Sequence, residues 1–324
     1  MRAVIYNRYG GPEVLELTER PLPEPSSTEI RVRVHGSSIN AADYRILTAT
    51  PFLARLHNGL LTPKRKVLGF DIAGEVDAVG EAVSEYAVGD RVFGNTYDDH
   101  WGGWAEYTCV SPRRVAPMPA SIDFEQAGAL ALAGVTALQG VRDFAGVRDG
   151  QRVLIQGAGG GVGTFAVQLA KAYGARVTAT CGAASLALVR SLGADEVIDY
   201  REQDVTRRGE VWDRIIAING NLPLSAYARS LAPGGVYVMC GGGNRQLFEA
   251  LLFGGLRSRG GLRFTTLDID EAKKGADLRE LARMIDAGQL RVVIDRSYPL
   301  AELPAAMRYV LDGHVQGKVA IRLD

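Results

Sequence analysis

A glycine-rich turn is the part of this sequence whose residue types and spacing point most directly to chemistry. Val153–Ile155 is a short apolar run typical of a buried strand, and a cluster of glycines at 157–163 follows it at once. The next segment, 164–173, repeats apolar residues on one helical face. A strand, a glycine turn and a helix N-terminus together present backbone N–H groups and a helix dipole to a pyrophosphate.

The residues of this turn are therefore candidate cofactor contacts. The six-residue fingerprint is Ala158-Gly159-Gly160-Gly161-Val162-Gly163, so alanine stands where a first glycine is usual. A second strand, Arg176–Thr180, follows where a βαβ unit needs it. This favours a dinucleotide site over the alternative, a glycine turn that holds no ligand. The predicted contacts in the turn are Ala158, Gly159, Gly160, Gly161 and Val162.

Composition disfavours several other classes of protein. The chain has 324 residues, enough for two domains with a core each. Thirty-seven basic residues balance thirty-seven acidic ones, which indicates no nucleic-acid or membrane partner, and the basic run Lys64–Lys66 is expected in a solvated loop. Three widely spaced cysteines argue against a disulfide framework. With no signal peptide and no apolar run of membrane-spanning length, we expect a cytoplasmic protein.

The chain divides into regions with different hydrophobic patterns. Residues 1–122 alternate short β patterns with turns, and Ile30–His35 has strict period two, which is typical of antiparallel, barrel-like β structure. Residues 123–294 alternate strand and helix patterns, which predicts a parallel, doubly wound sheet. The tail, 295–324, ends in a strand pattern and is expected to return to the first domain. The predicted fold class is α/β, a β-barrel domain plus a Rossmann domain.

Four motifs carry a family resemblance. They are Gly69–Val76, Val88–Val92, Ala133–Leu138 and the Val153–Gly163 block, and they occur in the order seen in medium-chain dehydrogenases/reductases. The chain resembles the zinc-independent quinone oxidoreductase branch over essentially its whole length. This resemblance implies a GroES-like β domain, a Rossmann domain and an active site in the cleft between them. It also favours a homodimer formed edge to edge through the Rossmann sheets, with Gly261–Thr266 as the edge strand.

The residues at the family's zinc positions disfavour a metal. The cysteine ligand of the zinc alcohol dehydrogenases falls on Asn40, and their histidine ligand falls on Phe70. Phenylalanine has no lone pair to give, and a neutral amide is a poor substitute for a thiolate on Zn²⁺. The four-cysteine structural-zinc lobe is also missing, since Cys109 is the only cysteine before residue 181. We predict no metal and hydride transfer to a quinone or an α,β-unsaturated carbonyl, an acceptor that needs no Lewis acid.

The end of the second strand bears on the choice of nicotinamide cofactor. Enzymes that select NAD place Asp or Glu there, whereas this strand ends in Cys181-Gly182. The resemblance implies that Ser185, Tyr200 and Arg201 hold a 2′-phosphate beside Cys181, which favours NADPH over NADH. The basic residue that relatives carry near position 184 is absent, which predicts a modest preference. Tyr200 that only packs, and Ser185 that only caps a helix, are the alternatives.

The resemblance also names residues for the reaction centre. Asn40 either orients a carboxamide or carbonyl oxygen or is a buried structural amide. Tyr44 or Arg45 either donates a hydrogen bond to a carbonyl oxygen or faces solvent, and bulk water protonates the product. The aromatic segment Asn95–Trp104 is expected to wall the substrate site, with His100 at the surface. The remaining predicted cofactor contacts are Thr136, Gly241 and Lys318.

Three functions therefore compete at this point. The leading hypothesis is a zinc-free, NADPH-dependent reductase of quinones or activated alkenes. The second is a non-catalytic, NADPH-binding regulatory protein, as nucleic-acid-binding and vesicle-associated relatives suggest. The third is an enoyl reductase of polyketide or lipid synthesis, which shares the glycine block.

Overall fold

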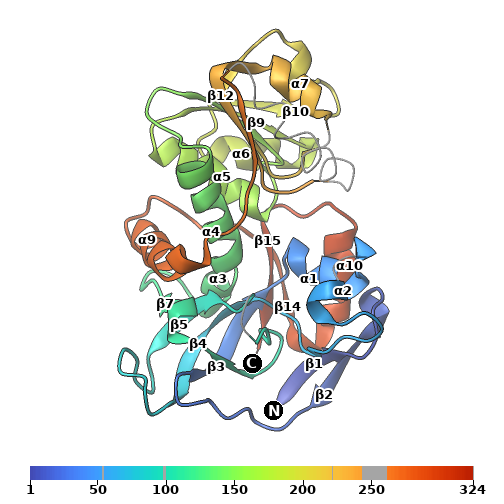
Figure 1. The fold of residues 1–324 in the computed structure, drawn as a ribbon, viewed down its shortest axis with the longest axis vertical. Coiled ribbons are helices and arrows are strands. Elements are labelled where there is room, and N and C mark those ends of the chain that lie inside the picture. The colour runs from blue at the N-terminus through green and yellow to red at the C-terminus, as the bar shows by residue number, and fades with distance from the viewer. Residues whose placement is uncertain (53–54, 98–99, 221, 243–260, 324) are drawn as a thin grey trace. The chain divides into compact units, whose positions relative to one another are not determined.

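A computed structural model describes residues 1–52, 55–97, 100–220, 222–242 and 261–323 (Figure 1). The chain forms two compact units, each with its own sheet. Unit 1 contains Met1–Ala133, Ala272–Gly288 and Val292–Asp324, and unit 2 contains Gly134–Glu271 and Gln289–Arg291. No helix in the described part of the chain is both long enough and apolar enough to cross a bilayer.

Unit 1 is built on a seven-stranded sheet in the order β14-β15-β3-β4-β5-β7, with β6 paired to β3. Its strands are β3 (Ile30–Ser38), β4 (Asp71–Val79), β5 (Arg91–Asn95), β6 (Tyr107–Val110), β7 (Val115–Pro117), β14 (Ile294–Pro299) and β15 (Lys318–Arg322). A separate hairpin pairs β1 (Arg2–Tyr6) with β2 (Leu15–Glu19). The period-two pattern predicted at Ile30–His35 forms β3, whose Ile30, Val32 and Val34 are buried.

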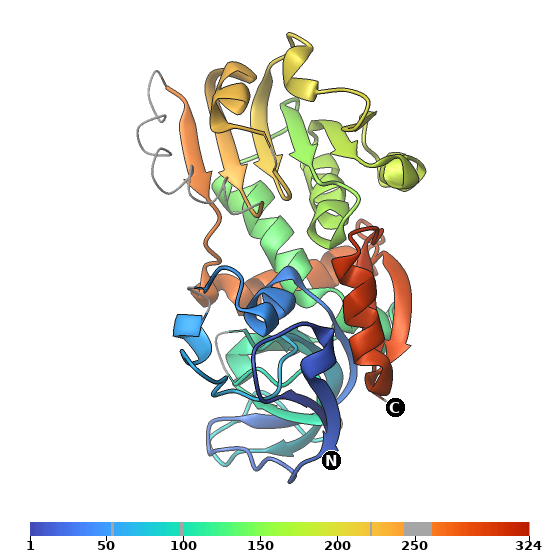
Figure 2. The same ribbon diagram turned by 90° about the vertical axis from the view of Figure 1, so that its right-hand side faces the viewer.

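The helices of unit 1 show that its limits differ from the predicted domain borders at residues 122 and 294. They are α1 (Ala41–Thr48), α2 (Arg55–Asn58), α3 (Phe124–Gly128), α9 (Lys274–Asp286) and α10 (Leu303–Leu311), and α10 contacts β14 (Figure 2). Helix α3 packs on β3 so closely that a Cβ on Gly36 would lie 2.0 Å from the Phe124 carbonyl oxygen. Helix α9 packs its buried face on β7. An amphipathic helix belongs to the unit whose sheet buries its apolar face. The sheet that α3 and α9 contact is that of unit 1, so both helices belong to unit 1.

The C-terminal strand also lies in this sheet. β15 pairs antiparallel with β3, placing Ala320 opposite Ser38 and Ile321 opposite Ser37. It pairs in parallel with β14 on its other side. The carboxyl end of β3, where α1 begins, therefore lies beside Lys318 at the start of β15.

Unit 2 holds a six-stranded parallel sheet in the order β10-β9-β8-β11-β12-β13 (Figure 2). Its strands are β8 (Arg152–Gln156), β9 (Arg176–Cys181), β10 (Glu196–Asp199), β11 (Trp212–Ala217), β12 (Leu231–Met239) and β13 (Arg263–Thr266). Its helices are α5 (Gly161–Ala172), α6 (Leu186–Ser191) and α7 (Leu224–Arg229), while α4 (Ala131–Gln139) crosses the border of the units. Counted from β8, this is the strand order of a Rossmann sheet, as predicted.

Stacked aromatic rings fill part of the core of unit 2. The rings of Tyr227 and Tyr237 lie 4.8 Å apart, and those of Tyr237 and Phe264 lie 5.3 Å apart. Trp212 and Ile215 of β11 are buried in the same cluster. This packing anchors β11, β12 and β13 and so supports the loops at their carboxyl ends.

Candidate active site

The glycine turn of unit 2 joins β8 to α5. Gly157 has a φ of +77°, and the N–H groups of Gly157 and Ala158 both donate to the carbonyl of Thr180, at 3.1 and 3.0 Å. A Cβ on Gly163 would lie 2.2 Å from the Gly157 carbonyl oxygen, so α5 packs this closely only with glycine there. The fingerprint predicted from the sequence began at Ala158. The structure gives the left-handed position to Gly157 instead, which explains why alanine is tolerated next to it.

The N-terminus of α5 is open on the side of Gly160. Gly160 is the N-cap residue, and no side chain caps the helix. A Cβ on Gly160 would meet one atom within 4 Å, the Gly157 carbonyl oxygen at 3.8 Å, whereas a Cβ on Gly159 would lie 2.6 Å from Ser185. Uncapped N–H groups at the start of a twelve-residue helix suit an anion. The turn therefore fits the pyrophosphate of a dinucleotide.

The residues predicted for a 2′-phosphate come together at the ends of β9 and β10. Cys181 lies opposite Asp199 in the parallel register, and its Cβ would be 3.5 Å from a Cβ on Gly159. The Tyr200 ring would lie 3.8 Å from a Cβ on Gly182. The Arg201 guanidinium lies 5.8 Å from the centroid of the Tyr200 ring. Because Ser185 also lies against Gly159, one region of unit 2 holds all four predicted residues.

Asp199, which was not among the predicted contacts, also belongs to this region. One of its carboxylate oxygens accepts a hydrogen bond from the Arg201 N–H at 2.9 Å, so it holds the turn that carries Tyr200 and Arg201. Burial, together with the nearby Asp199 carboxylate, raises the pKa of the Cys181 thiol to about 11. The thiol is therefore neutral at pH 7. The signal was available: an acidic residue ends the third strand instead of the second.

The other predicted contacts of unit 2 lie on different elements. Thr136 is half-buried on α4. Gly241 follows β12, and a Cβ there would lie 2.6 Å from the Ile218 carbonyl oxygen, just past β11. A Cβ on Gly157 would lie 3.0 Å from the Asn219 nitrogen. The ends of β8 and β11 therefore touch where the strand order reverses, which is the place where open α/β sheets bind ligands.

In unit 1, α1 begins at Asn40 and is tied down by Asp43. The Asn40 N–H donates to Asp43 Oδ2 at 2.7 Å, and the Gly69 N–H donates to Asp43 Oδ1 at 3.1 Å. Asp43 is fully buried, and burial together with the Asp71 carboxylate raises its pKa to about 8. This carboxyl therefore links the start of α1 to the residue before Phe70, and the Asn40 side chain stays available for other partners.

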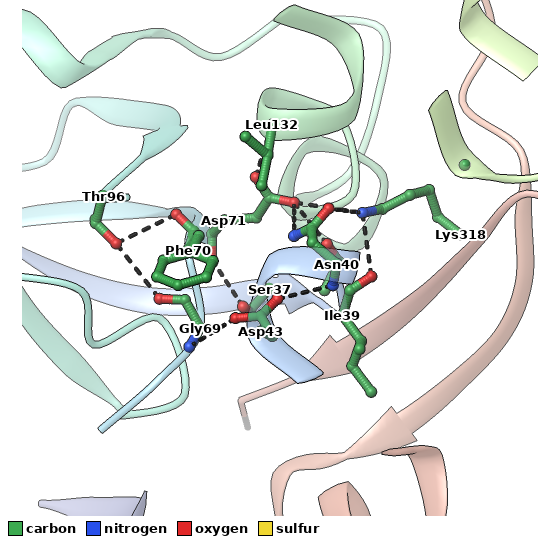
Figure 3. A network of polar contacts seen from close by, with 12 residues as sticks. Ser37, Ile39, Asn40, Asp43, Gly69, Phe70, Asp71, Thr96, Leu132 and Lys318 are labelled. Carbon is green, nitrogen blue, oxygen red and sulfur yellow. Dashed lines mark hydrogen bonds and ion pairs between the residues drawn. The ribbon is translucent and has the colours of Figure 1, made fainter. Parts of the chain in front are cut away.

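Those partners belong to a buried cluster around Asp71 at the start of β4 (Figure 3). Asp71 Oδ2 accepts hydrogen bonds from Ser38 Oγ at 2.6 Å and from Asn40 Nδ2 at 2.9 Å. Asp71 Oδ1 accepts from the Leu132 N–H at 2.7 Å. The Lys318 ammonium lies 3.5 Å from Asp71 Oδ2 and forms a buried ion pair with it. We call these five residues the Asp71 cluster.

Lys318 is enclosed in this cluster. Its Nζ donates to Asn40 Oδ1 at 2.5 Å and to the Ile39 carbonyl at 3.3 Å, as well as contacting Asp71. Its side chain is only 3% exposed, and burial lowers its pKa. An ammonium has three donors, and these three partners occupy them. Asn40 is therefore a buried amide in contact with the side chains of Asp71 and Lys318, and its orientation of a carboxamide or carbonyl oxygen stays a prediction.

Helix α1 also carries the two other predicted catalytic residues. Tyr44 and Arg45 are both half-buried, next to the fully buried Asp43. The Tyr44 carbonyl accepts a hydrogen bond from Thr48 Oγ1 at 2.7 Å, within the helix. Neither side chain is fully exposed to solvent, and hydrogen bonding to an acceptor stays a prediction for both.

The aromatic segment predicted as a wall packs on Phe70. The Phe70 ring lies edge-to-face with Tyr97 at 4.9 Å and with Trp101 at 5.4 Å. Trp101 is buried, with a φ of +66°, while the His100 side chain is 62% exposed and lies 2.7 Å from Glu29. His100 is thus a surface residue, as expected.

The side chains at the family's zinc positions contact other protein groups. Asn40 is bonded within the Asp71 cluster, and Phe70 is packed between aromatic rings. Across the described ranges, no group of three or more His, Cys, Asp or Glu could hold a metal ion. An amide, a phenyl ring and an ammonium do not make a zinc site.

Comparisons with known proteins agree with this geometry. The model of the alcohol dehydrogenase GroES-like domain matches residues 26–120, and a model described as zinc-binding dehydrogenase matches residues 192–321. A chloroplastic quinone oxidoreductase of Triphysaria versicolor is 32% identical over 99% of this chain and 98% of its own length. A chloroplastic NADPH-dependent alkenal/one oxidoreductase of Arabidopsis thaliana is 30% identical over 99% of this chain and 79% of its own length.

Solved structures agree as well. The quinone oxidoreductase of Coxiella burnetii superimposes with a TM-score of 0.88 at 30% identity, covering 100% of this chain and 99% of that one. The CurK enoyl reductase superimposes with a TM-score of 0.85 at 25% identity, covering 100% and 99%. The predicted fold class, a GroES-like β domain plus a Rossmann domain, is confirmed.

Proposed function

Because the chain belongs to the zinc-independent quinone oxidoreductase branch of the medium-chain dehydrogenase/reductase superfamily, we propose that it transfers a hydride from NADPH to a quinone or an α,β-unsaturated carbonyl compound. It is an NAD(P)H-dependent oxidoreductase. The Asp71 cluster carries the choice of acceptor. Since an amide (Asn40) and a phenyl ring (Phe70) stand at the family's zinc positions, the proposed acceptor is one that is already polarised.

Unit 2 supplies the groups for the cofactor. The N–H groups of Gly161 and Val162 at the start of α5 would hold the pyrophosphate, while the Gly160 N–H donates to the Gly157 carbonyl at 3.3 Å and shapes the turn. Thr136 and Gly241 are proposed for the nicotinamide half. When bound, the cofactor supplies the hydride.

Unit 1 supplies groups for orientation and charge. The Asn40 amide retains one N–H beyond its bond to Asp71, and this N–H is proposed to orient a carboxamide or carbonyl oxygen. Lys318 is a positioning residue that acts through Asn40. Tyr44 or Arg45 donates a hydrogen bond to the oxygen on which negative charge develops, and water protonates the product.

The preference for NADPH rests on the region around Cys181. The neutral thiol does not repel a 2′-phosphate, and Arg201 and Tyr200 lie beside it. A charge-assisted hydrogen bond to phosphate contributes about 1.5–3 kcal/mol. The Asp199 carboxylate opposes the phosphate, and no basic residue stands near position 184, so the preference is modest.

Titration of both cofactors tests this preference. Wild type should bind NADPH at least several-fold more tightly than NADH, and Arg201→Gln should weaken NADPH about tenfold and leave NADH unchanged. Arg207→Gln is the matched control, because Arg207 is an exposed arginine of the same unit. Equal affinities in the wild type would place the 2′-phosphate elsewhere.

A substrate screen tests the reaction itself. NADPH consumption is followed with quinones, enones and enoyl thioesters, and with Tyr44→Phe and Arg45→Gln variants. We expect turnover of quinones or enones, and a fall of about 10²-fold in kcat/KM for the variant that removes the donor. Cofactor binding without turnover of any acceptor would favour the regulatory alternative.

Enoyl reduction is the second candidate, favoured by the similarity to the CurK enoyl reductase. An enoyl thioester is also an activated alkene, so the same residues serve it. A kcat/KM for enoyl thioesters well above that for quinones would select this function.

A further inference from the structure

An apolar patch on unit 1 has no role in the site described above. Four large hydrophobic side chains within ten residues are exposed: Phe52 (63%), Leu56 (66%), Leu60 (54%) and Leu61 (88%). They follow α1 and flank or belong to α2. Monomeric soluble proteins rarely expose apolar side chains in a contiguous patch, so this patch marks an interaction surface.

Hydrogen bonds hold these residues in one compact loop. Arg55 Nη1 donates to the Leu60 carbonyl at 3.1 Å, and the Arg55 guanidinium lies 4.9 Å from the Phe52 ring. Tyr9 Oη donates to the Gly59 carbonyl at 2.6 Å, which ties the loop to the N-terminal segment. These contacts hold the segments that carry the four exposed side chains together in one loop.

The sequence interval that contains this loop carries only basic charges. Between Tyr44 and Phe70 the sequence contains no Asp or Glu, although the whole chain has no net charge. Five basic residues lie in this interval: Arg45, Arg55, Lys64, Arg65 and Lys66. The N–H groups of Lys64 and Arg65 donate to the Asn58 carbonyl and Asn58 Oδ1, both at 2.7 Å, so the basic run folds back on the end of α2. Lys64 and Arg65 are both exposed in this run, and the Arg65 guanidinium lies 4.7 Å from the centroid of the Trp101 ring.

We propose that this surface, formed by Phe52, Leu56, Leu60, Leu61, Lys64 and Arg65 and called the docking loop, binds an anionic lipid bilayer. The apolar side chains enter the interface, and the basic groups pair with anionic headgroups. A bilayer fits better than a protein partner, because its headgroups supply counter-charge across a loop that has no carboxylate of its own. The earlier expectation of no membrane partner rested on net charge, which hides this local excess. The inference does not depend on the proposed function.

Vesicle binding tests the docking loop. The full-length protein is sedimented with vesicles of phosphatidylcholine alone and of phosphatidylcholine with phosphatidylserine. We expect binding only to the vesicles that contain phosphatidylserine, and weaker binding at roughly 0.5 M salt. Lys64→Glu reverses a charge and should weaken binding about twentyfold, since each basic residue near an anionic surface contributes about fivefold. Leu61→Glu should weaken it at least tenfold.

Two matched controls make the result specific. Val88→Glu places the same charge at another apolar residue of unit 1 that is 68% exposed, and Arg20→Glu reverses an exposed charge outside the loop. Both should bind vesicles like wild type, and all four variants should keep wild-type turnover of a water-soluble acceptor. Absence of binding to the anionic vesicles, or equal loss in the controls, overturns the proposal. A Leu61→Glu variant that changes from dimer to monomer, without any vesicle binding by wild type, would assign the loop to contacts between copies.

Discussion

Replacing Lys318 with methionine should destabilise unit 1 by about 3 kcal/mol. Removing one partner of a buried ion pair costs about 3–5 kcal/mol, because it leaves an uncompensated charge. In this structure the Asp71 carboxylate keeps three donors, from Ser38, Asn40 and Leu132, which favours the lower end of that range. Methionine retains an unbranched stem and adds no charge.

The reciprocal change should cost less. In Asp71→Asn the buried Lys318 loses its counter-charge, but burial already lowers the pKa of Lys318, so the ammonium releases its proton more easily. We expect a loss of about 1–3 kcal/mol. The double variant Lys318→Met/Asp71→Asn buries no charge in the pair and should recover part of the loss, with a coupling energy of about 2 kcal/mol.

Thermal unfolding followed by tryptophan fluorescence measures these changes. Trp101 and Trp104 belong to unit 1, and Trp104 Nε1 donates to the Ser38 carbonyl beside the Asp71 cluster. A loss of 3 kcal/mol corresponds to a fall in Tm of roughly 6–12 °C. Lys171→Met is the control, since it breaks a partly exposed ion pair with Asp195 worth at most about 1 kcal/mol. If Lys318→Met lowers Tm no more than this control, the buried pair does not hold unit 1 together.

Four further predictions concern protonation, the glycine turn, metal and assembly. The pKa of Asp43 in the folded state, about 8, exceeds the ordinary value near 4. The protonated Asp43 carboxyl should therefore contribute fully to stability below pH 4. This contribution should be lost as the pH rises through 8, by at most about 1.4 kcal/mol per pH unit. Denaturation at pH 5 and pH 8 should give a smaller difference for Asp43→Asn than for wild type, and equal differences would contradict this. Gly159→Ala should raise the Kd for NADPH at least tenfold, because its Cβ would lie 2.6 Å from Ser185, whereas Gly182→Ala, with 3.8 Å to its nearest neighbour, should leave the Kd unchanged. Elemental analysis should find no stoichiometric zinc, and activity should survive a chelator; one zinc per chain, lost together with activity, would reverse this. Light scattering at micromolar concentration should give a homodimer, because β13 is an edge of the described sheet, and a monomeric mass would refute it.

The local sequence pattern was sufficient to predict much of the fold. The alternation at Ile30–His35 depends only on neighbouring residues, and it formed β3 with the expected buried face. The glycine turn between β8 and α5 was likewise predictable, because strand, turn and helix are contiguous in the chain. The limits of the two units were not predictable from local pattern. The sequences of α3 and α9 do not show which sheet each helix packs on, and the structure places them on Gly36 of β3 and on β7.

For the candidate site, the sequence by itself determined which side chains are present: glycines at an anion-binding turn, no acidic residue at the end of β9, and Asn40 and Phe70 at the zinc positions. Only the tertiary structure decided what they contact. The cofactor contact of Lys318 stays a prediction, and the structure adds its contacts with Asp71 and Asn40, which are more than two hundred residues away in sequence. Periodicity cannot reveal this pair, because it arises when β15 returns to β3, and buried charges must then find partners within reach.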